Sequence, residues 1–221
     1  MKKKLILIGP LAIMIFTLSA FINLNTVSEN PANNSTVGHN MPSLESGKLH
    51  SNMRKLWEDH IVWTRNVIFC LADNLPGKDH AIKRLMQNQD DIGNAIKPYY
   101  GEDAGNKLAA LLHDHIEIAA EIINLAKMND EVKLAYANKK WTANADEISD
   151  FLSKANPNWN KEEMQEMMHT HLKLTNNEVV ARLKKDYNAD IRAYDQVHDE
   201  ILEMSDMLSS GIIKQFPDKF N

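Results

Sequence analysis

Cysteine, glycine and proline are all scarce in this chain of 221 residues. Cys70 is the single cysteine, so no disulfide can form within the chain and a disulfide-stapled fold is excluded. The eight glycines fall mostly at predicted turns, and none belongs to a glycine-rich loop between a strand and a helix. Because loops of that kind hold phosphates, the sequence gives no indication of a nucleotide-binding site.

Charge of a single sign is also lacking. The net charge is -5, and lysine, arginine, aspartate and glutamate are interspersed along the chain. There is no basic stripe of the kind that binds nucleic acid, and no acidic tail. We therefore expect no nucleic-acid partner.

The N-terminal residues have the order of an export segment. Three lysines at positions 2–4 precede a charge-free apolar stretch from Leu5 to about Leu24. We interpret residues 1–28 as a signal peptide or an uncleaved signal anchor, because the stretch is also near the length that spans a bilayer. The protein is therefore predicted to be extracytoplasmic, either secreted or held in the cytoplasmic membrane by this segment.

Residues 29–47 are rich in Asn, Ser, Pro and Gly, and they read as a disordered linker. From residue 48 to residue 221, apolar residues recur at steps of three and four, which is typical of amphipathic helices. Turn residues divide this body into six helices, at roughly 47–74, 79–96, 102–128, 131–155, 161–185 and 187–211. No segment alternates like a strand, so we predict an all-α antiparallel bundle with a four-helix core.

Four of the predicted helices carry a histidine near the middle of the face that should point inward. Positions three, four and seven apart share a helix face, and this spacing selects His60, His115, His171 and His198. In antiparallel packing, the four rings should lie within a turn or two of one level.

Converging imidazoles are typical ligands of Zn, Cu, Fe or Ni, so the four histidines form a candidate metal site. Asp195 and Glu178 are candidate auxiliary ligands or orienting groups, followed by Glu121 and Asp114. Methionines beside His171 would suit copper. The sequence shows neither an open coordination position nor a substrate pocket, so we favour a non-catalytic metal-binding role.

The competing interpretation is a structural one. Buried imidazoles can be hydrogen-bonded to Thr175, Gln89, Asp195 or backbone carbonyls in a polar layer that fixes the register of the helices. Glu178 and Arg182 are four residues apart and can form an ion pair within one helix. The protein would then be an envelope-associated structural or interaction protein without metal.

The strings LWEDHIVWTR, IGNAIKPYYG, LLHDHIEIAAEI, WTANADEISDFL and DMLSSGIIKQFP resemble a family of uncharacterised bacterial helical proteins, many of them exported. The resemblance covers nearly all of residues 49–220. It implies that the positions of His60, His115 and His171 are commonly histidine, whereas the position of His198 is not always so. Family members sometimes carry the labels acetylglutamate kinase or glycosyltransferase, but this chain lacks the phosphate-binding loop and parallel sheet that those activities need.

Overall fold

A computed structural model describes residues 43–221 of the chain. The predicted export segment at 1–28 and nearly all of the predicted linker at 29–47 lie outside the described residues. Within the described part, no helix is both long enough and apolar enough to cross a bilayer.

The described chain is helical, as the periodicity predicts. Its six helices and final 3-10 turn are α1 (Leu44–Ala72), α2 (Lys78–Tyr100), α3 (Glu102–Met128), α4 (Glu131–Ala155), α5 (Lys161–Leu183), α6 (Tyr187–Gln215) and η1 (Pro217–Lys219). Polar side chains fix several helix starts by accepting from a free backbone N–H of the first turn. Asn160 accepts from the N–H of Glu163 at 3.0 Å, and Asp186 accepts from that of Ala189 at 3.0 Å.

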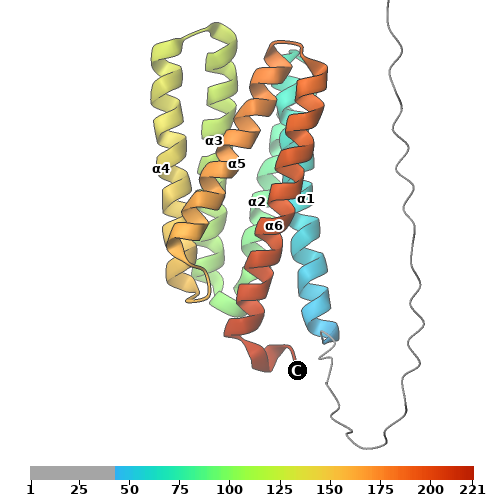
Figure 1. Cartoon of the computed structure of the whole chain (residues 1–221), viewed down its shortest axis with the longest axis vertical. Coiled ribbons are helices and arrows are strands. Elements are labelled where there is room, and N and C mark those ends of the chain that lie inside the picture. The colour runs from blue at the N-terminus through green and yellow to red at the C-terminus, as the bar shows by residue number, and fades with distance from the viewer. Residues whose placement is uncertain (1–42) are drawn as a thin grey trace, which may run out of the picture. The chain divides into compact units, whose positions relative to one another are not determined.

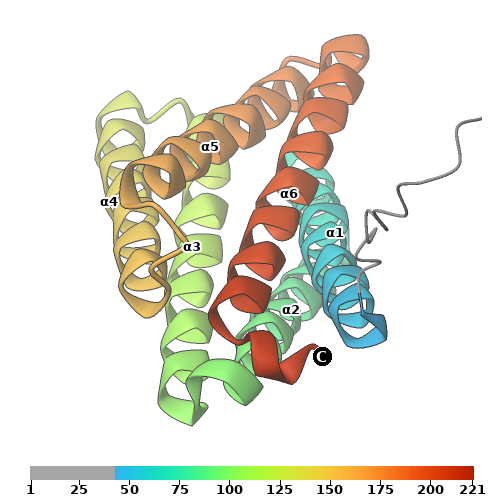
Figure 2. The same ribbon diagram turned by 60° about the horizontal axis from the view of Figure 1, so that its bottom comes forward.

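The helices alternate in direction along the chain, so that α1, α3 and α5 run one way and α2, α4 and α6 run the other (Figure 1). Each helix packs on the next one in the sequence, and α6 closes the ring by packing on α1. In addition, α1 contacts both α3 and α5 across the interior. Figure 2 shows α5 crossing the other helices obliquely to reach α6. Three parallel helices thus face one another inside the ring.

All six helices contribute to the main hydrophobic core, which differs from the four-helix core expected from the sequence. Fully buried members include Met53 of α1, Ile92 of α2, Ile148 of α4, Met164 of α5 and Ile201 of α6. A second apolar cluster, which includes Ile68, Leu85 and Val179, fills the region between α1, α2, α3 and α5.

Three helix boundaries differ from the sequence prediction for identifiable reasons. The second helix does not end near Ile96 but runs through Pro98 to Tyr100, because Pro98 removes only its own N–H and Gly101, at φ 86°, closes the last turn by donating its N–H to the carbonyl of Lys97 at 2.9 Å. The first helix begins at Leu44, inside the expected linker, because Ser43 caps it by accepting from the N–H of Ser46 at 3.2 Å. The last helix continues past Gly211 to Gln215. Gly211 does not end the helix but admits the Trp159 ring, since a Cβ at this position would lie 2.0 Å from Trp159 Nε1.

Candidate functional site

Three of the four predicted histidines meet inside the bundle, one from each of the parallel helices α1, α3 and α5. His60, His115 and His171 are only 2–3% exposed. The ring centre of His171 lies 5.9 Å from that of His60 and 6.2 Å from that of His115. We call these three residues the histidine cluster.

Hydrogen bonds orient two of the three rings. Asn144 donates through Nδ2 to the carbonyl of Leu111 at 3.0 Å, so its Oδ1 is left to accept from His115 Nδ1 at 2.8 Å. His171 Nδ1 donates to the Glu200 carboxylate at 2.9 Å. With the proton on Nδ1, the neutral tautomer of an imidazole keeps a free lone pair on Nε2. Neither Nε2 has a hydrogen-bond partner among the described residues.

His60 is the exception, because its Nδ1 is buried without any hydrogen-bond partner among the described residues. Gln89 lies close by and favours the protonated ring, yet Gln89 Oε1 is itself left unpaired. The Oγ1 atom of Thr175, one turn after His171, is also unpaired. Buried polar atoms are normally hydrogen-bonded, so several unpaired ones together indicate a place where water or an ion binds.

A small cavity lies at the centre of the histidine cluster. Its volume is about 10 Å³, and its lining is made up of His60, His115, His171, Trp57, Leu112, Met168, Ile201 and Met204. One buried water molecule needs roughly 10–15 Å³, so the cavity can take a single small species such as a metal ion. The two methionine sulfur atoms are the other potential donors in this lining.

Burial keeps the His60 and His115 rings neutral. Desolvation, reinforced by the neighbouring His171 ring, lowers the pKa of His115 to about 3. The same desolvation, together with His171 and His115, lowers the pKa of His60 well below its ordinary value. Both rings therefore keep a lone pair at neutral pH, which is the form that binds a metal.

The spacing of the rings is close to that of a metal site. Imidazoles bound to one tetrahedral ion at 2.0–2.1 Å have ring centres about 5 Å apart. The observed 5.9 and 6.2 Å therefore require the His60 and His115 rings each to approach the His171 ring by about 1 Å. Within the part of the chain that the structure describes, no set of three or more His, Cys, Asp or Glu side chains is already arranged to hold a metal ion.

The prediction that His198 joins the cluster is wrong. Its side chain is 27% exposed, and its Nε2 lies 3.4 Å from the Glu58 carboxylate at the surface. The buried face of α6 instead contains Ala193, Val197, Ile201 and Met204. The face on which the helical spacing placed His198 is rotated by one residue, or 100°, from this buried face. Asp195 is exposed for the same reason.

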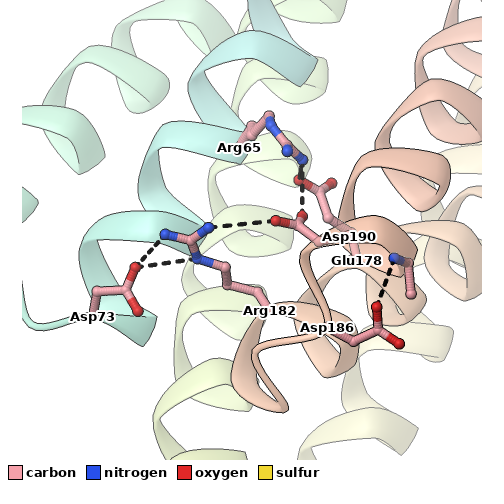
Figure 3. A network of polar contacts seen from close by, with 7 residues as sticks. Arg65, Asp73, Glu178, Arg182, Asp186 and Asp190 are labelled. Atoms are coloured by element: carbon pink, nitrogen blue, oxygen red, sulfur yellow. Dashed lines mark hydrogen bonds and ion pairs between the residues drawn. The ribbon is translucent and has the colours of Figure 1, made fainter.

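Glu178 is buried as expected but belongs to a different group of charges (Figure 3). Its Oε1 lies 2.5 Å from Arg65 Nη1, and Arg65 also contacts Asp190 at 3.0 Å. Arg182, the expected partner of Glu178, pairs with Asp73 and Asp190 instead. We call these five residues the buried charge network.

The buried charge network lies away from the histidine cluster. Glu178 follows His171 by seven residues on α5, which corresponds to about 10 Å along the helix. Burial raises the pKa of Glu178 to about 7, although Arg65 acts in the opposite direction. Because its carboxylate is bound by Arg65 at this distance from the rings, Glu178 is not an auxiliary ligand of the cluster.

Glu121 and Asp114, the remaining predicted carboxylates, line a surface groove of about 570 Å³ between α3 and α4. Glu117 and Glu147 add two more acidic side chains, and Lys140 is the one basic residue of the lining. Asn144 lines the same groove, and it is hydrogen-bonded to His115. The groove therefore brings a cation-attracting surface to within one side chain of the histidine cluster.

The sequence interpretation missed the two residues that orient the rings. Asn144 could have been found, because it stands in the apolar stripe of Trp141, Ala145 and Ile148 on α4. A polar residue in such a stripe indicates a buried hydrogen bond. Glu200 gave no such signal, because it lies at the edge of the buried face of α6.

No known protein family, curated protein or solved structure matches the chain. What the protein does therefore has to be inferred from its interior side chains.

Proposed function

We propose that this protein is an extracytoplasmic metal-binding helical bundle that holds one transition-metal ion between His60, His115 and His171. One observation carries the proposal. Three imidazoles from three helices surround a cavity the size of a single water molecule. His115 Nε2, His171 Nε2 and His60 Nδ1 have no hydrogen-bond partner among the described residues.

The orientation of the rings supports this reading. Metal-binding histidines usually donate their second N–H to a carboxylate, an amide or a backbone carbonyl, which fixes the ring and raises its basicity. His171 donates to Glu200 and His115 donates to Asn144 in this way. These two partners would act as orienting groups, while the ligands themselves come from α1, α3 and α5.

The nature of the donors favours copper among Zn, Cu, Fe and Ni. Imidazole binds all four metals, but thioether sulfur is a ligand that selects copper(I). Met168 and Met204 line the cavity together with the three rings, and both side chains are buried. A site of three imidazoles and nearby thioethers is soft and uncharged, which suits a monovalent copper ion better than a divalent one.

The structural alternative, a hydrogen-bonded polar layer without metal, has partial support. His115 and His171 each have one good hydrogen bond, as that reading requires. The unpaired His60 Nδ1, Gln89 Oε1 and Thr175 Oγ1 argue against it, since a half-satisfied polar layer is less stable than an apolar one. The unpaired His60 Nδ1 is explained if the cluster exists to hold an ion, because His60 lines the cavity.

The extracytoplasmic location rests on the sequence of residues 1–28 alone. Separation of secreted, membrane and cytoplasmic fractions of the producing cells tests it independently of metal binding. Recovery of the protein in the cytoplasmic fraction would contradict the location without affecting the proposed site.

The experiment that tests metal binding compares four purified proteins: the wild type, His60→Leu, His171→Leu and His198→Leu. Each is stripped with a chelator, loaded anaerobically with copper(I) or with zinc, passed through a desalting column and measured by elemental analysis. We expect one equivalent of copper in the wild type and in His198→Leu, and none in the other two. His198→Leu is the matched control, because it removes a histidine outside the cluster.

Two outcomes would overturn the proposal. A wild type that retains no metal under any loading condition removes the proposed function. Loss of metal in His198→Leu, equal to the loss in His60→Leu, would show that the ion binds elsewhere. Circular dichroism confirms that the variants are folded.

A further inference from the structure

A second cavity lies one helical turn from the histidine cluster. Its lining includes Thr64, Ala119 and Thr175, each of which follows a cluster histidine by four residues on α1, α3 and α5. These three helices run in the same direction (Figure 1), so the residue four positions after each histidine lies about 6 Å further along its helix, toward the same end of the bundle. This apolar cavity therefore lies directly beside the cluster, along the axis of the bundle.

The lining determines what the apolar cavity can hold. Its volume is about 30 Å³, and its walls are almost entirely apolar, formed by side chains such as Ile116, Ile123 and Val179. A charged molecule is excluded, because burying a charge without a partner is very costly. Apolar cavities of this kind stay dry and take up small apolar molecules, and a benzene-sized occupant needs a cavity of about 150 Å³. One water molecule takes roughly 10–15 Å³ on the same measure, so the cavity has room for an occupant of about two heavy atoms.

Two threonines belong to the otherwise apolar lining. Thr64 Oγ1 and Thr175 Oγ1 are both buried and lack hydrogen-bond partners among the described residues. Both threonines line the apolar cavity on the side that leads, within one turn, to His60 and His171. A small molecule with a weak acceptor atom can use these hydroxyl groups without bringing a charge into the core.

Trp141 and His115 stand between the two cavities. The Trp141 ring lines the apolar cavity, and its centre lies 5.2 Å from that of the His115 ring, which lines the cavity of the histidine cluster. One layer of aromatic side chains therefore separates the apolar cavity from the histidine cluster at this point.

We propose that the apolar cavity admits small uncharged diatomic molecules, of the class of dioxygen, carbon monoxide and nitric oxide, to the metal held by the histidine cluster. The part of this proposal that concerns the metal rests on the proposed function. Occupation of the cavity itself does not, because the apolar walls are present with or without the ion. The two parts can therefore be tested separately.

The first experiment uses xenon as an apolar probe of the metal-free protein. Methyl resonances of Ile116 and Ile123 are followed by NMR at increasing xenon pressure. We expect saturable shifts in the wild type and their loss in Val179→Ile, which adds one methyl group to the cavity wall. Ala120→Val adds volume from α3 and is the second filling variant. Val180→Ile, the same change at an exposed neighbour, is the matched control and should retain the shifts.

The second experiment uses carbon monoxide as the probe of the copper(I)-loaded protein. The infrared band of the copper-bound molecule should appear in the wild type and in Val180→Ile, and it should form severalfold more slowly in Val179→Ile. Absence of saturable xenon shifts in the wild type, or their persistence in both filling variants, would refute the cavity as a binding site. Equal rates of carbon monoxide binding in Val179→Ile and Val180→Ile would refute it as the route to the metal. Failure to load copper at all would instead refute the proposed function, and the xenon result would still stand alone.

Discussion

Replacing His60 by leucine is expected to stabilise the metal-free protein. The His60 ring is 2% exposed, and its Nδ1 has no hydrogen-bond partner among the described residues, so the wild type carries the desolvation cost of an unsatisfied polar atom. That cost is about 1–3 kcal/mol, and leucine of similar size removes it while adding apolar burial against Trp57 and Ile201. We expect His60→Leu to raise the free energy of unfolding by about 1–2 kcal/mol.

His115→Leu is the matched control, and we expect it to change the free energy of unfolding in the opposite direction. This substitution removes the hydrogen bond from His115 Nδ1 and leaves Asn144 Oδ1 buried without a partner. Loss of one partner of a buried pair costs about 1–3 kcal/mol, so the free energy of unfolding should fall by this amount. Two leucine substitutions in one cluster are thus expected to differ by several kcal/mol.

The assay is urea denaturation in the presence of a chelator at pH 8, which is above the ordinary pKa of histidine. A shift of the midpoint at constant slope reports a change in stability. If His60→Leu destabilises the protein as much as His115→Leu, then His60 is hydrogen-bonded and the cluster is a satisfied polar layer. Saturation with metal should reverse the order of wild type and His60→Leu, because only the wild type gains binding free energy.

Three further outcomes follow from the structure. Burial holds the pKa of His60 in the folded protein well below its value in the unfolded chain, so the wild type loses stability as the pH falls below about 6.5. We therefore expect His60→Leu to unfold at a lower pH than the wild type in an acid titration followed by circular dichroism. The pKa of Glu178 is raised to about 7, so its contribution to stability is present below about 4.5 and is lost as the pH rises through about 7. In urea titrations at pH 5 and pH 8, the difference in free energy of unfolding between the wild type and Glu178→Gln should therefore shift against the wild type at pH 8, and a difference that is the same at both pH values would contradict this. Gly211→Ala places a Cβ 2.0 Å from Trp159 Nε1 and should lower the melting temperature. Gly47→Ala in α1 meets nothing within 4 Å and should raise the melting temperature slightly, because alanine stabilises a helix by roughly 0.5–1 kcal/mol relative to glycine.

The helices could be predicted closely because their signals are local. The third and fourth helices have the expected bounds, since Gly101, Asn129 and Asp130 are turn and capping residues that act within a few positions of the helix end. Gly211 was misread because its reason is tertiary. The sequence alone does not distinguish a glycine that makes room for a tryptophan of another segment from a glycine that ends a helix.

The candidate site was predicted in part for the same reason. Helical spacing placed His60, His115 and His171 inside, because apolar residues flank each of them on one face of α1, α3 or α5, although on α5 that face also contains Thr175 and Glu178. It failed at His198, where the exposed Ile191 suggested a buried face that the packing of α6 against α1 and α5 does not use. When apolar residues stand on two faces of a helix that differ by one residue, the sequence does not show which of the two faces is buried.

By itself, the sequence determined that the described chain is a bundle of six helices and that three histidines stand on buried faces. These features depend on residues a few positions apart, which form a helix and give it one apolar face. Only the tertiary structure decided which rings meet, that Asn144 and Glu200 orient them, and that Arg65 rather than Arg182 binds Glu178. Those contacts join residues 29 to 113 positions apart, and they depend on how the helices are rotated and crossed in the ring. No periodicity within a single helix specifies that rotation.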